Sequence, residues 1–193
     1  MFIDEYIADS INTKQKILED KTILATIQKA ADIISNAYKN NKKVLTAGNG
    51  GSAGDAQHIA GEFVSKFYFD RPGLNSIALS TDTSILTAIG NDYGYENVFS
   101  RQIQALGQSG DVFIAISTSG NSKNILKAIE EANVQNLVTI GFCGQKECAM
   151  DKVCDIIIKV PSNETPKIQE SHIMIGHIIC ALVEKEIFGG YKK

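Results

Sequence analysis

A histidine and a glutamate stand four residues apart in the stretch AGNGGSAGDAQHIAGEF, residues 47–63. On a helix this spacing places His58 and Glu62 on one face, one turn apart. An imidazole and a carboxylate there can serve as an acid/base pair or as ligands of a zinc ion. The apolar neighbours Ile59 and Phe63 indicate a mostly buried helix, where a charged pair needs a reason. The alternative is a solvated His/Glu pair on a helix surface, which this spacing also produces.

The last helical stretch, PKIQESHIMIGHIICALVEKEIF, carries further polar side chains on an otherwise apolar helix: Gln169, Glu170, His172 and His177. His177 lies deep in the apolar run and is the histidine least expected to face solvent. Spacing alone pairs His177 with Glu170, which lies about 20° off the same face, while Gln169 lies about 80° away. Periodicity leaves the choice between these two partners open.

Two turns rich in glycine and hydroxyl groups precede helical segments. The first, GNGGSA, matches the dinucleotide-binding pattern G-x-G-x-x-A, but the acidic residue expected at the end of the second strand is missing. We expect this loop to recognise a sugar instead, through the backbone amides of Gly50 and Gly51 and the side chain of Asn49. The simpler alternative is that Ser52 and Asp55 form a capping box for the next helix.

The second turn, STSGNS at residues 117–122, concentrates hydroxyl groups directly before a helix. The hydroxyls belong to Ser117, Thr118, Ser119 and Ser122. A helix N-terminus carries unpaired N–H groups and partial positive charge, which suit a phosphate group. The turn contains no lysine of the kind a nucleoside-triphosphate loop carries, so it predicts a single phosphomonoester on a small molecule. A serine cap on a tight turn is the alternative, but a cap needs only one hydroxyl.

The elements that must position these residues alternate along the chain. Short, continuously apolar runs predict strands at 42–48, 75–80, 111–118, 137–144 and 155–161. Helical patterns lie between them, at 52–67, 84–90 with 95–106, 122–134 and 166–188. The alternation predicts a three-layer α/β/α fold around a five-stranded parallel sheet, in one structural domain. Ligands of such sheets bind beyond the carboxyl ends of the strands, where both turns fall.

Residues 1–41 contain no glycine or proline and predict two helices, interrupted around Ser10–Thr13. They form an N-terminal helical extension to the sheet domain at 42–193. Ile3, Ile7 and Ile11 make an apolar stripe that is exposed unless it packs on the domain or on another subunit. The stripe therefore favours an oligomer.

Composition narrows the class of protein. The 193 residues are 44% hydrophobic and carry a net charge of −3, with the basic residues spread along the chain, so we expect no nucleic-acid partner. We find neither a signal peptide nor a membrane-spanning stretch in the sequence, and expect a cytoplasmic protein. The cysteines fit no zinc or disulfide spacing and are expected to be reduced thiols; they are Cys143, Cys148, Cys154 and Cys180.

With these residues in view, the chain resembles the sugar isomerase (SIS) domain family, and within it the bacterial phosphoheptose isomerases. The resemblance runs along nearly the whole chain. It rests on the N-terminal helices, GNGGSAGDAQHIAGE, NDYGYE at 91–96, STSGNS and the helix with Gln169 and His177. The family has a flavodoxin-like sheet, which agrees with the alternation described above.

The resemblance implies a set of site residues. Substrate contacts would be Asn49, Gly50, Gly51, Glu62, Asn91, Asp92, Ser117, Thr118, Ser119, Ser122 and Gln169. The ligands of one zinc ion per subunit would be His58, Glu62, Gln169 and His177, with Glu62 and His177 also the catalytic acid/base pair. The resemblance thus selects Gln169 over Glu170. It also implies a homotetramer with sites near the subunit contacts.

The implied reaction converts sedoheptulose 7-phosphate to D-glycero-D-manno-heptose 7-phosphate, for surface polysaccharide precursors. A proton moves between C1 and C2 through an enediol(ate), with Glu62 as base and His177 as acid. Zinc would polarise the carbonyl; whether Glu62 stays on the metal during turnover is open, because a ligating carboxylate is a poorer base. Two alternatives remain: a non-catalytic SIS protein that binds the replication initiator, and an isomerase or sensor of another phosphosugar.

Overall fold

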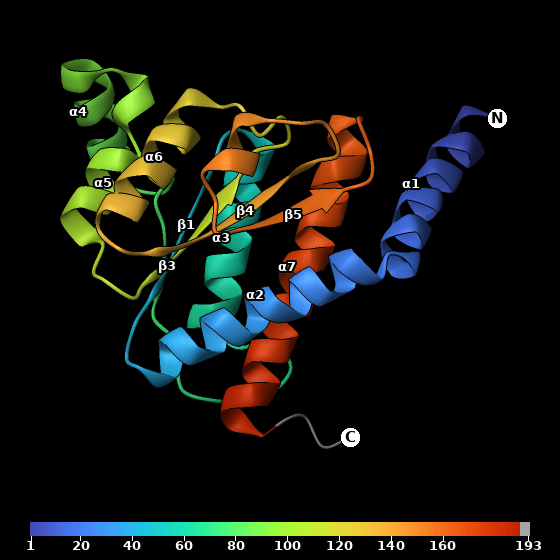
Figure 1. The fold of residues 1–193 in the computed structure, drawn as a ribbon, viewed down its shortest axis with the longest axis horizontal. Helices are drawn as coiled ribbons and strands as arrows, with labels where there is room; N and C mark the ends of the chain where they lie inside the picture. The colour runs from blue at the N-terminus through green and yellow to red at the C-terminus, as the bar shows by residue number, and fades with distance from the viewer. Residues whose placement is uncertain (190–193) are drawn as a thin grey trace.

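The computed structural model describes residues 1–189, in which a five-stranded parallel sheet lies between two groups of helices (Figure 1). Residues 190–193, the end of the predicted sheet domain, lie outside the described residues. The strands are β1 (Val44–Gly48), β2 (Ser76–Ala78), β3 (Val112–Ile116), β4 (Val138–Gly144) and β5 (Ile156–Val160). Their order, β2-β1-β3-β4-β5, confirms the predicted flavodoxin-like sheet. The five predicted strand runs are also confirmed, with ends shifted by a few residues.

Alternate side chains of the strands enter two separate apolar cores, because successive residues of a strand point to opposite faces. On one face lie α2 (Lys21–Lys39), α3 (Gly51–Val64) and α7 (Thr165–Phe188). On the other lie α4 (Thr83–Tyr93), α5 (Ser100–Leu106) and α6 (Lys123–Val134), with the 3₁₀ turns η1 (Tyr95–Asn97) and η2 (Ala149–Lys152). In β3, for example, Ile114 faces the first core and Phe113 the second. Within residues 1–189 the helices lack the combination of length and hydropathy that a bilayer-spanning segment requires.

The N-terminal residues form two helices, but the predicted interruption around Ser10–Thr13 is wrong. Helix α1 runs unbroken over Phe2–Glu19, and the bend comes at Asp20. The Asp20 carboxylate accepts hydrogen bonds from the backbone N–H groups of Thr22 (2.8 Å) and Ile23 (3.1 Å) and so starts α2. Figure 1 shows α1 projecting from the body of the molecule, whereas α2 lies across it.

Helices α3 and α7 pack closely, and glycines allow it. A Cβ atom on Gly176 of α7 would lie 2.8 Å from the Ile59 side chain of α3. A Cβ atom on Gly51 would lie 2.5 Å from Nε2 of Gln169. These two contacts place early α7 beside early α3 and later α7 beside later α3. The two helices therefore run side by side in the same direction.

The turn from β1 into α3 depends on backbone conformations that favour glycine. Gly50 has a φ of +56° and is the N-cap of α3, without a side-chain capping bond. The alternative of a capping box from Ser52 and Asp55 is therefore wrong, because Gly50 and not Ser52 is the N-cap. Ser52 lies within the helix and is buried. Helix α3 ends at Val64, earlier than the predicted end at 67.

Candidate active site

His58 and Glu62 of α3 meet His177 of α7, where the two helices lie side by side. Nε2 of His58 lies 3.1 Å from Oε1 of Glu62 and 3.4 Å from Nε2 of His177. The two imidazole rings are edge to face, with centroids 4.8 Å apart. The fold thus brings together side chains that are 119 residues apart in the sequence.

This cluster is open to solvent on one side. The His58 side chain is 50% exposed and that of Glu62 is 23% exposed. One potential ligand atom from each of the three side chains lies within 4.8 Å of the others. Around a tetrahedral zinc ion, nitrogen and oxygen ligands are roughly 3.3 Å apart, so the donor types and their spacing fit such an ion. Two imidazole nitrogens that face each other at 3.4 Å are also well placed to share a cation or a proton.

Gln169 and Glu170 point to different neighbours. The Gln169 amide lies against Gly51, at the start of α3. The Glu170 carboxylate lies 3.7 Å from Nζ of Lys14, toward α1. Gln169 therefore faces α3, the helix that also carries His58 and Glu62, although spacing along α7 alone favoured Glu170.

The expectation that His177 is the histidine least exposed to solvent is wrong, because His177 is half-buried and His172, on the same helix, belongs to the core. Its side chain is fully buried, and its Nε2 lies 3.3 Å from the carbonyl oxygen of Cys143. Burial lowers the pKa of His172 to about 4, although the contact with the Cys143 carbonyl acts in the opposite direction. The imidazole is therefore neutral near pH 7 and takes no part in the cluster with His177.

The serine-rich turn brings the hydroxyls of Ser117, Ser119 and Ser122 close together. Gly120 has a φ of +64°, and its N–H donates to the carbonyl of Ser117 (2.9 Å). Ser122 is the N-cap of α6, but its hydroxyl makes no capping bond and lies 3.0 Å from the Ser117 hydroxyl. Ser117 is buried, whereas Thr118 is half-buried and Ser119 exposed. The Ser122 hydroxyl is thus turned toward the other hydroxyls and away from a purely structural cap.

The glycine loop is fixed to the helix that follows the serine turn. The side-chain amides of Asn49 and Asn124 exchange two hydrogen bonds, of 2.9 and 2.8 Å. Tyr95 donates its hydroxyl to Oδ1 of Asn49 (3.1 Å). Because β1 and β3 are neighbours in the sheet, both turns leave the same edge. The Asn49 side chain thus sets the relative position of the two turns.

Asn91 and Asp92 lie in the last turn of α4 and are both exposed, with the Asn91 amide donating to the Asp92 carboxylate (2.7 Å). Figure 1 shows α4 at the edge of the molecule far from α7. From this stretch it is Tyr95 that contacts the glycine loop. No role is predicted for Tyr95 from the sequence; its place within NDYGYE is the signal that could have suggested one.

Two further features border the site. A polar cavity of about 220 Å³ opens beside the serine turn; among its lining residues are Thr118, Ser119, Lys146 and Ser162.

Asp55, one turn before His58, has a buried carboxylate oxygen that makes no hydrogen bond within the described residues. Burial raises the pKa of Asp55 to about 6, against the effect of nearby His58. From the sequence, Asp55 is expected only as a helix cap.

Comparisons with known proteins identify the family of the chain. The family model described as "SIS domain" matches residues 5–144. Phosphoheptose isomerase 2 of Campylobacter jejuni is 63% identical over 188 residues, which cover 97% of this chain and 94% of the relative. Phosphoheptose isomerase of Aneurinibacillus thermoaerophilus is 62% identical over 187 residues, with the same two coverages.

A solved structure extends the similarity to three dimensions. Phosphoheptose isomerase GmhA from Neisseria gonorrhoeae superposes with a TM-score of 0.88 at 40% sequence identity. The match covers 95% of this chain and 97% of that chain. Sequence and fold therefore agree over nearly the full length of both proteins. The chain belongs to the SIS domain family and, within it, to the phosphoheptose isomerases.

Proposed function

We propose that this enzyme converts sedoheptulose 7-phosphate to D-glycero-D-manno-heptose 7-phosphate by moving a proton between C1 and C2. The observation that carries the proposal is the convergence of His58, Glu62 and His177 from two helices. The names of the relatives, at 63% and 62% identity, support the same substrate. An aldose–ketose interconversion needs a base for carbon and an acid for oxygen, and these side chains supply both.

Glu62 is the base in this proposal. Its carboxylate removes a proton from C1 of the ketose, and the electron pair forms an enediol(ate) between C1 and C2. The same proton, or one exchanged with solvent, then returns to C2. His177 gives a proton to the oxygen on C2 and accepts one from the oxygen on C1. The half-exposed setting of the cluster lets an open-chain sugar approach both side chains.

Zinc is the metal that the donor set favours. We propose that His58, Glu62, Gln169 and His177 hold one ion per subunit; two imidazoles, a carboxylate and an amide are ligands that zinc accepts. When bound, the ion supplies a positive charge that polarises the sugar carbonyl. The Gln169 amide lies against the glycine loop at Gly51.

The phosphate would bind at the other end of the substrate, on Ser117, Thr118, Ser119 and Ser122. The amides of Gly50 and Gly51 and the polar groups of Asn49, Asn91 and Asp92 would contact the sugar hydroxyls. Along α3, His58 lies seven residues beyond Gly51, which corresponds to about 10 Å. An open-chain heptose phosphate is long enough to reach from the glycine loop to the cluster, and a phosphate held at its far end would orient the reacting carbons.

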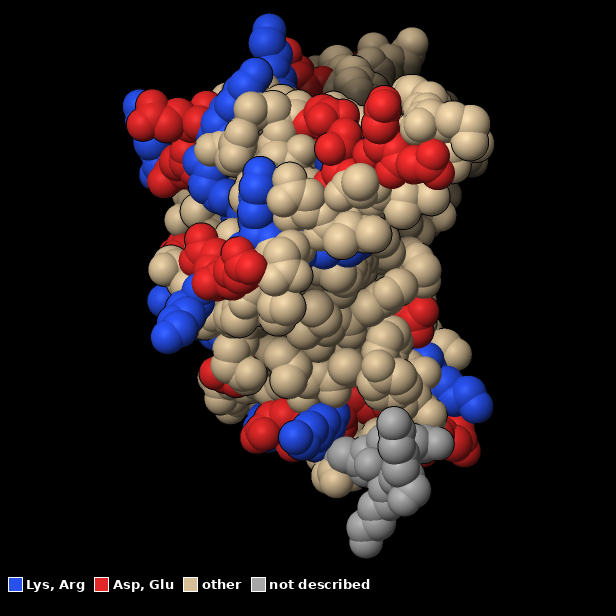
Figure 2. Space-filling model, turned by 90° about the vertical axis from the view of Figure 1, so that its right-hand side faces the viewer, with Lys and Arg blue, Asp and Glu red and all other residues tan. Residues whose placement is uncertain are grey.

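A second copy of the chain is the partner that we propose for α1, in a homotetramer. Ile3, Ile7 and Ile11 are 67%, 53% and 62% exposed. A groove of about 420 Å³ along α7, lined largely by apolar side chains, borders on His177. Figure 2 shows the side of the molecule on which α1 lies in Figure 1, with a broad uncharged surface between charged groups at its ends and margins. Exposed apolar surfaces, such as the isoleucine stripe and this groove, mark interaction sites. Residues 1–41 would then serve the oligomer contact of an enzyme working in the cytoplasm.

The test of the function is a direct assay. The purified protein is given sedoheptulose 7-phosphate, and ketose phosphates of five and six carbons serve as matched controls. We expect formation of the seven-carbon aldose phosphate and much slower reaction of the shorter sugars. A faster reaction with a shorter sugar would show that the shorter sugar is the substrate. Inactivity on all of these sugars would refute the proposal that the protein is an isomerase.

A further inference from the structure

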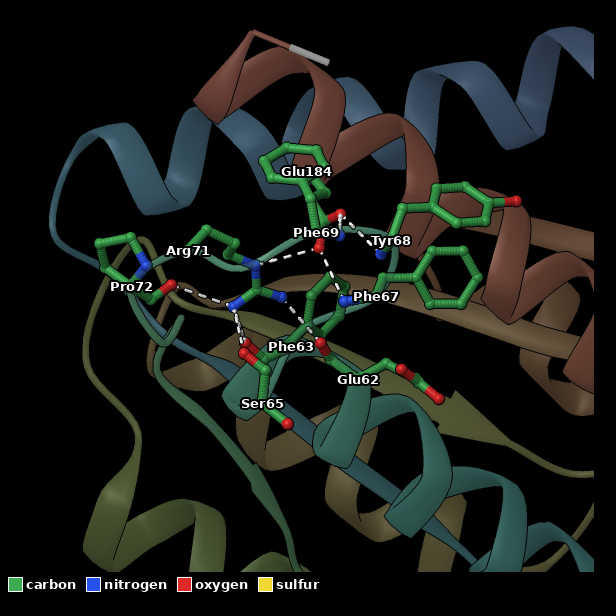
Figure 3. Close-up of polar contacts among 9 residues, drawn as sticks. All are labelled: Glu62, Phe63, Ser65, Phe67, Tyr68, Phe69, Arg71, Pro72 and Glu184. Atoms are coloured by element: carbon green, nitrogen blue, oxygen red, sulfur yellow. Dashed lines mark hydrogen bonds and ion pairs between the residues drawn. The ribbon is translucent and has the colours of Figure 1, made fainter. Parts of the chain in front are cut away.

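Arg71 and Glu184 form a buried ion pair close to the candidate site, and the mechanism above does not use it. Their side chains are only 2% and 1% exposed, and Nε of Arg71 lies 3.1 Å from Oε2 of Glu184. Figure 3 shows Glu184, from α7, pointing into the segment that leaves α3. A buried ion pair seldom adds net stability, because removing both charges from water costs about as much as their attraction returns. Its surroundings therefore indicate what else it does.

The Glu184 carboxylate orders the segment after α3. It accepts hydrogen bonds from the backbone N–H groups of Phe67 (2.8 Å), Tyr68 (2.8 Å) and Phe69 (3.3 Å). Burial by itself raises the pKa of Glu184, but these N–H groups and the Arg71 guanidinium outweigh burial and lower the pKa. The carboxylate is thus ionised at neutral pH and holds three successive residues in place.

The Arg71 guanidinium caps the C-terminal end of α3. It donates from Nη2 to the carbonyl of Glu62 (2.8 Å) and from Nη1 to the carbonyls of Phe63 (2.7 Å) and Ser65 (3.0 Å). The last carbonyls of a helix lack partners within the helix, and here one side chain supplies them. Helix α3 therefore ends two residues after Glu62, held at the backbone of the proposed base itself.

The same segment also reaches the proposed acid. The Phe67 ring lies against the His177 imidazole, with centroids 5.6 Å apart. Phe67 also donates its backbone N–H to the Glu184 carboxylate, at 2.8 Å. The ion pair is therefore linked to Glu62 by a direct hydrogen bond and to His177 through one aromatic contact.

We propose that Arg71 and Glu184 are positioning residues, which hold the end of α3 and Phe67 so that Glu62 and His177 keep their mutual geometry. This inference rests on the proposed function. It differs from a merely structural role because it predicts a loss of turnover in a protein that is folded and still binds the substrate. A displacement of about 1 Å at reacting groups can cost 100-fold in rate.

The experiment compares Glu184→Gln with Asp111→Asn. Asp111 is a matched control: it is also buried, it pairs with Lys43 (2.6 Å), and it accepts backbone N–H groups of Lys43 (3.0 Å) and Gln108 (2.8 Å). It precedes β3, at the amino end of the sheet, opposite the two turns. Both variants exchange a buried carboxylate for an amide, and both are expected to lower the melting temperature.

For Glu184→Gln we expect kcat to fall about 10- to 100-fold while KM changes less than about twofold, because the phosphate turn is untouched. Asp111→Asn keeps the wild-type kcat. An unchanged kcat in folded Glu184→Gln overturns the proposal, and so does an equal loss of kcat in Asp111→Asn.

Two further variants decide the matter if Glu184→Gln does not fold. Arg71→Lys keeps the charge but cannot reach several carbonyls at once, so we expect a kcat loss of about tenfold. Phe67→Leu leaves the ion pair in place and removes only the ring beside His177. Wild-type kcat in both variants contradicts positioning through this segment.

A zinc titration separates this proposal from the proposed function. If the wild-type protein has no isomerase activity, the function fails, and zinc affinity then judges the ion pair. Loss of a group that supports a metal ligand costs about 10- to 100-fold in affinity, and we expect a loss in that range for Glu184→Gln. Equal zinc affinity in wild type, Glu184→Gln and Asp111→Asn overturns the positioning role.

Discussion

Within residues 1–189, two groups of side chains are close enough together to hold a metal ion, and they differ in what else their atoms bind. In the first, between α3 and α7, the polar atoms of His58, Glu62 and His177 face one another and solvent. The second lies behind the serine turn. It consists of Cys143, Cys148 and Asp151.

The atoms of the second group are already committed. Asp151 accepts a hydrogen bond from the N–H of Cys148 (2.9 Å) and pairs with Nζ of Lys159 (2.8 Å). The two sulfur atoms are 3.9 Å apart. Burial is the main cause that raises the pKa of the Cys143 thiol, and the neighbouring Cys148 raises it further. A raised thiol pKa increases the cost of forming the thiolate that a metal binds. Closeness of ligand types is therefore not enough for a metal site, and unoccupied lone pairs in the right charge state are also needed.

The largest expected effect comes from Glu62→Gln, which removes the base and keeps the shape of the side chain. General bases contribute about 10²- to 10⁴-fold, so we expect kcat to fall about 1,000-fold. Steady-state kinetics with sedoheptulose 7-phosphate measures the loss, and substrate binding by calorimetry should survive. Activity near wild type would remove Glu62 from the mechanism and erase the contrast between the two groups.

Metal removal compares the two groups directly. We expect a chelator to abolish activity, zinc to restore it, and metal analysis to find one zinc ion per chain. Loss of a group that only supports a ligand costs about 10- to 100-fold in affinity, so His58→Ala should cost more. The matched control, Cys143→Ser with Cys148→Ser, should keep its zinc. Zinc lost from the cysteine variant and kept by His58→Ala would reverse the assignment.

His172 borders the second group through the carbonyl of Cys143 and gives a prediction of pH-dependent stability. Its pKa is lowered from 6.5 to about 4 on folding, chiefly by burial. The unfolded chain therefore binds more protons between these values, and stability present above pH 6.5 is lost as the pH falls toward 4. Between pH 7 and 5 the loss is about 2 kcal/mol.

The variant His172→Gln cannot titrate, so its free energy of unfolding should vary less with pH over this range. Denaturant unfolding at pH 7, 6 and 5 measures the difference, and kcat at pH 7 should not change. Parallel pH profiles for wild type and variant would contradict the buried, neutral imidazole.

Much of this architecture could be predicted because local sequence determines it. The strands were predictable because buried parallel strands are apolar on both faces, as in VFIAI of β3. The bend between the first helices was misplaced because Ser10, Asn12 and Thr13 are polar but compatible with a helix. The actual boundary between the two helices lies at Asp20, whose carboxylate caps the start of α2.

Contacts between distant segments were beyond such reasoning. His58 and Glu62 share a face by spacing alone, but whether Gln169 or Glu170 faces them depends on how α7 is rotated against α3. Close contacts at Gly51 and Gly176 set that rotation. The Arg71–Glu184 pair joins residues 113 positions apart, and neither belongs to a recognisable motif.

Cys148→Ser should have the smallest effect. The Cys148 sulfur packs against Gly120 of the serine turn, where a Cβ atom would collide with it. Serine fills slightly less space and buries a hydroxyl, at a cost of about 1 kcal/mol, which a thermal melt can detect. Because the sulfur supports the turn only by contact, we expect kcat to stay within about twofold of wild type.

The comparison with Cys180→Ser, another buried thiol but one in α7, controls for the loss of any buried sulfur. Similar melting temperatures and similar kcat values in both variants would show that the second group serves only to pack the core. A selective rise in KM for Cys148→Ser would instead show that the thiol sets the shape of the phosphate turn. A selective loss of zinc would make the second group a metal site and end the contrast between the two.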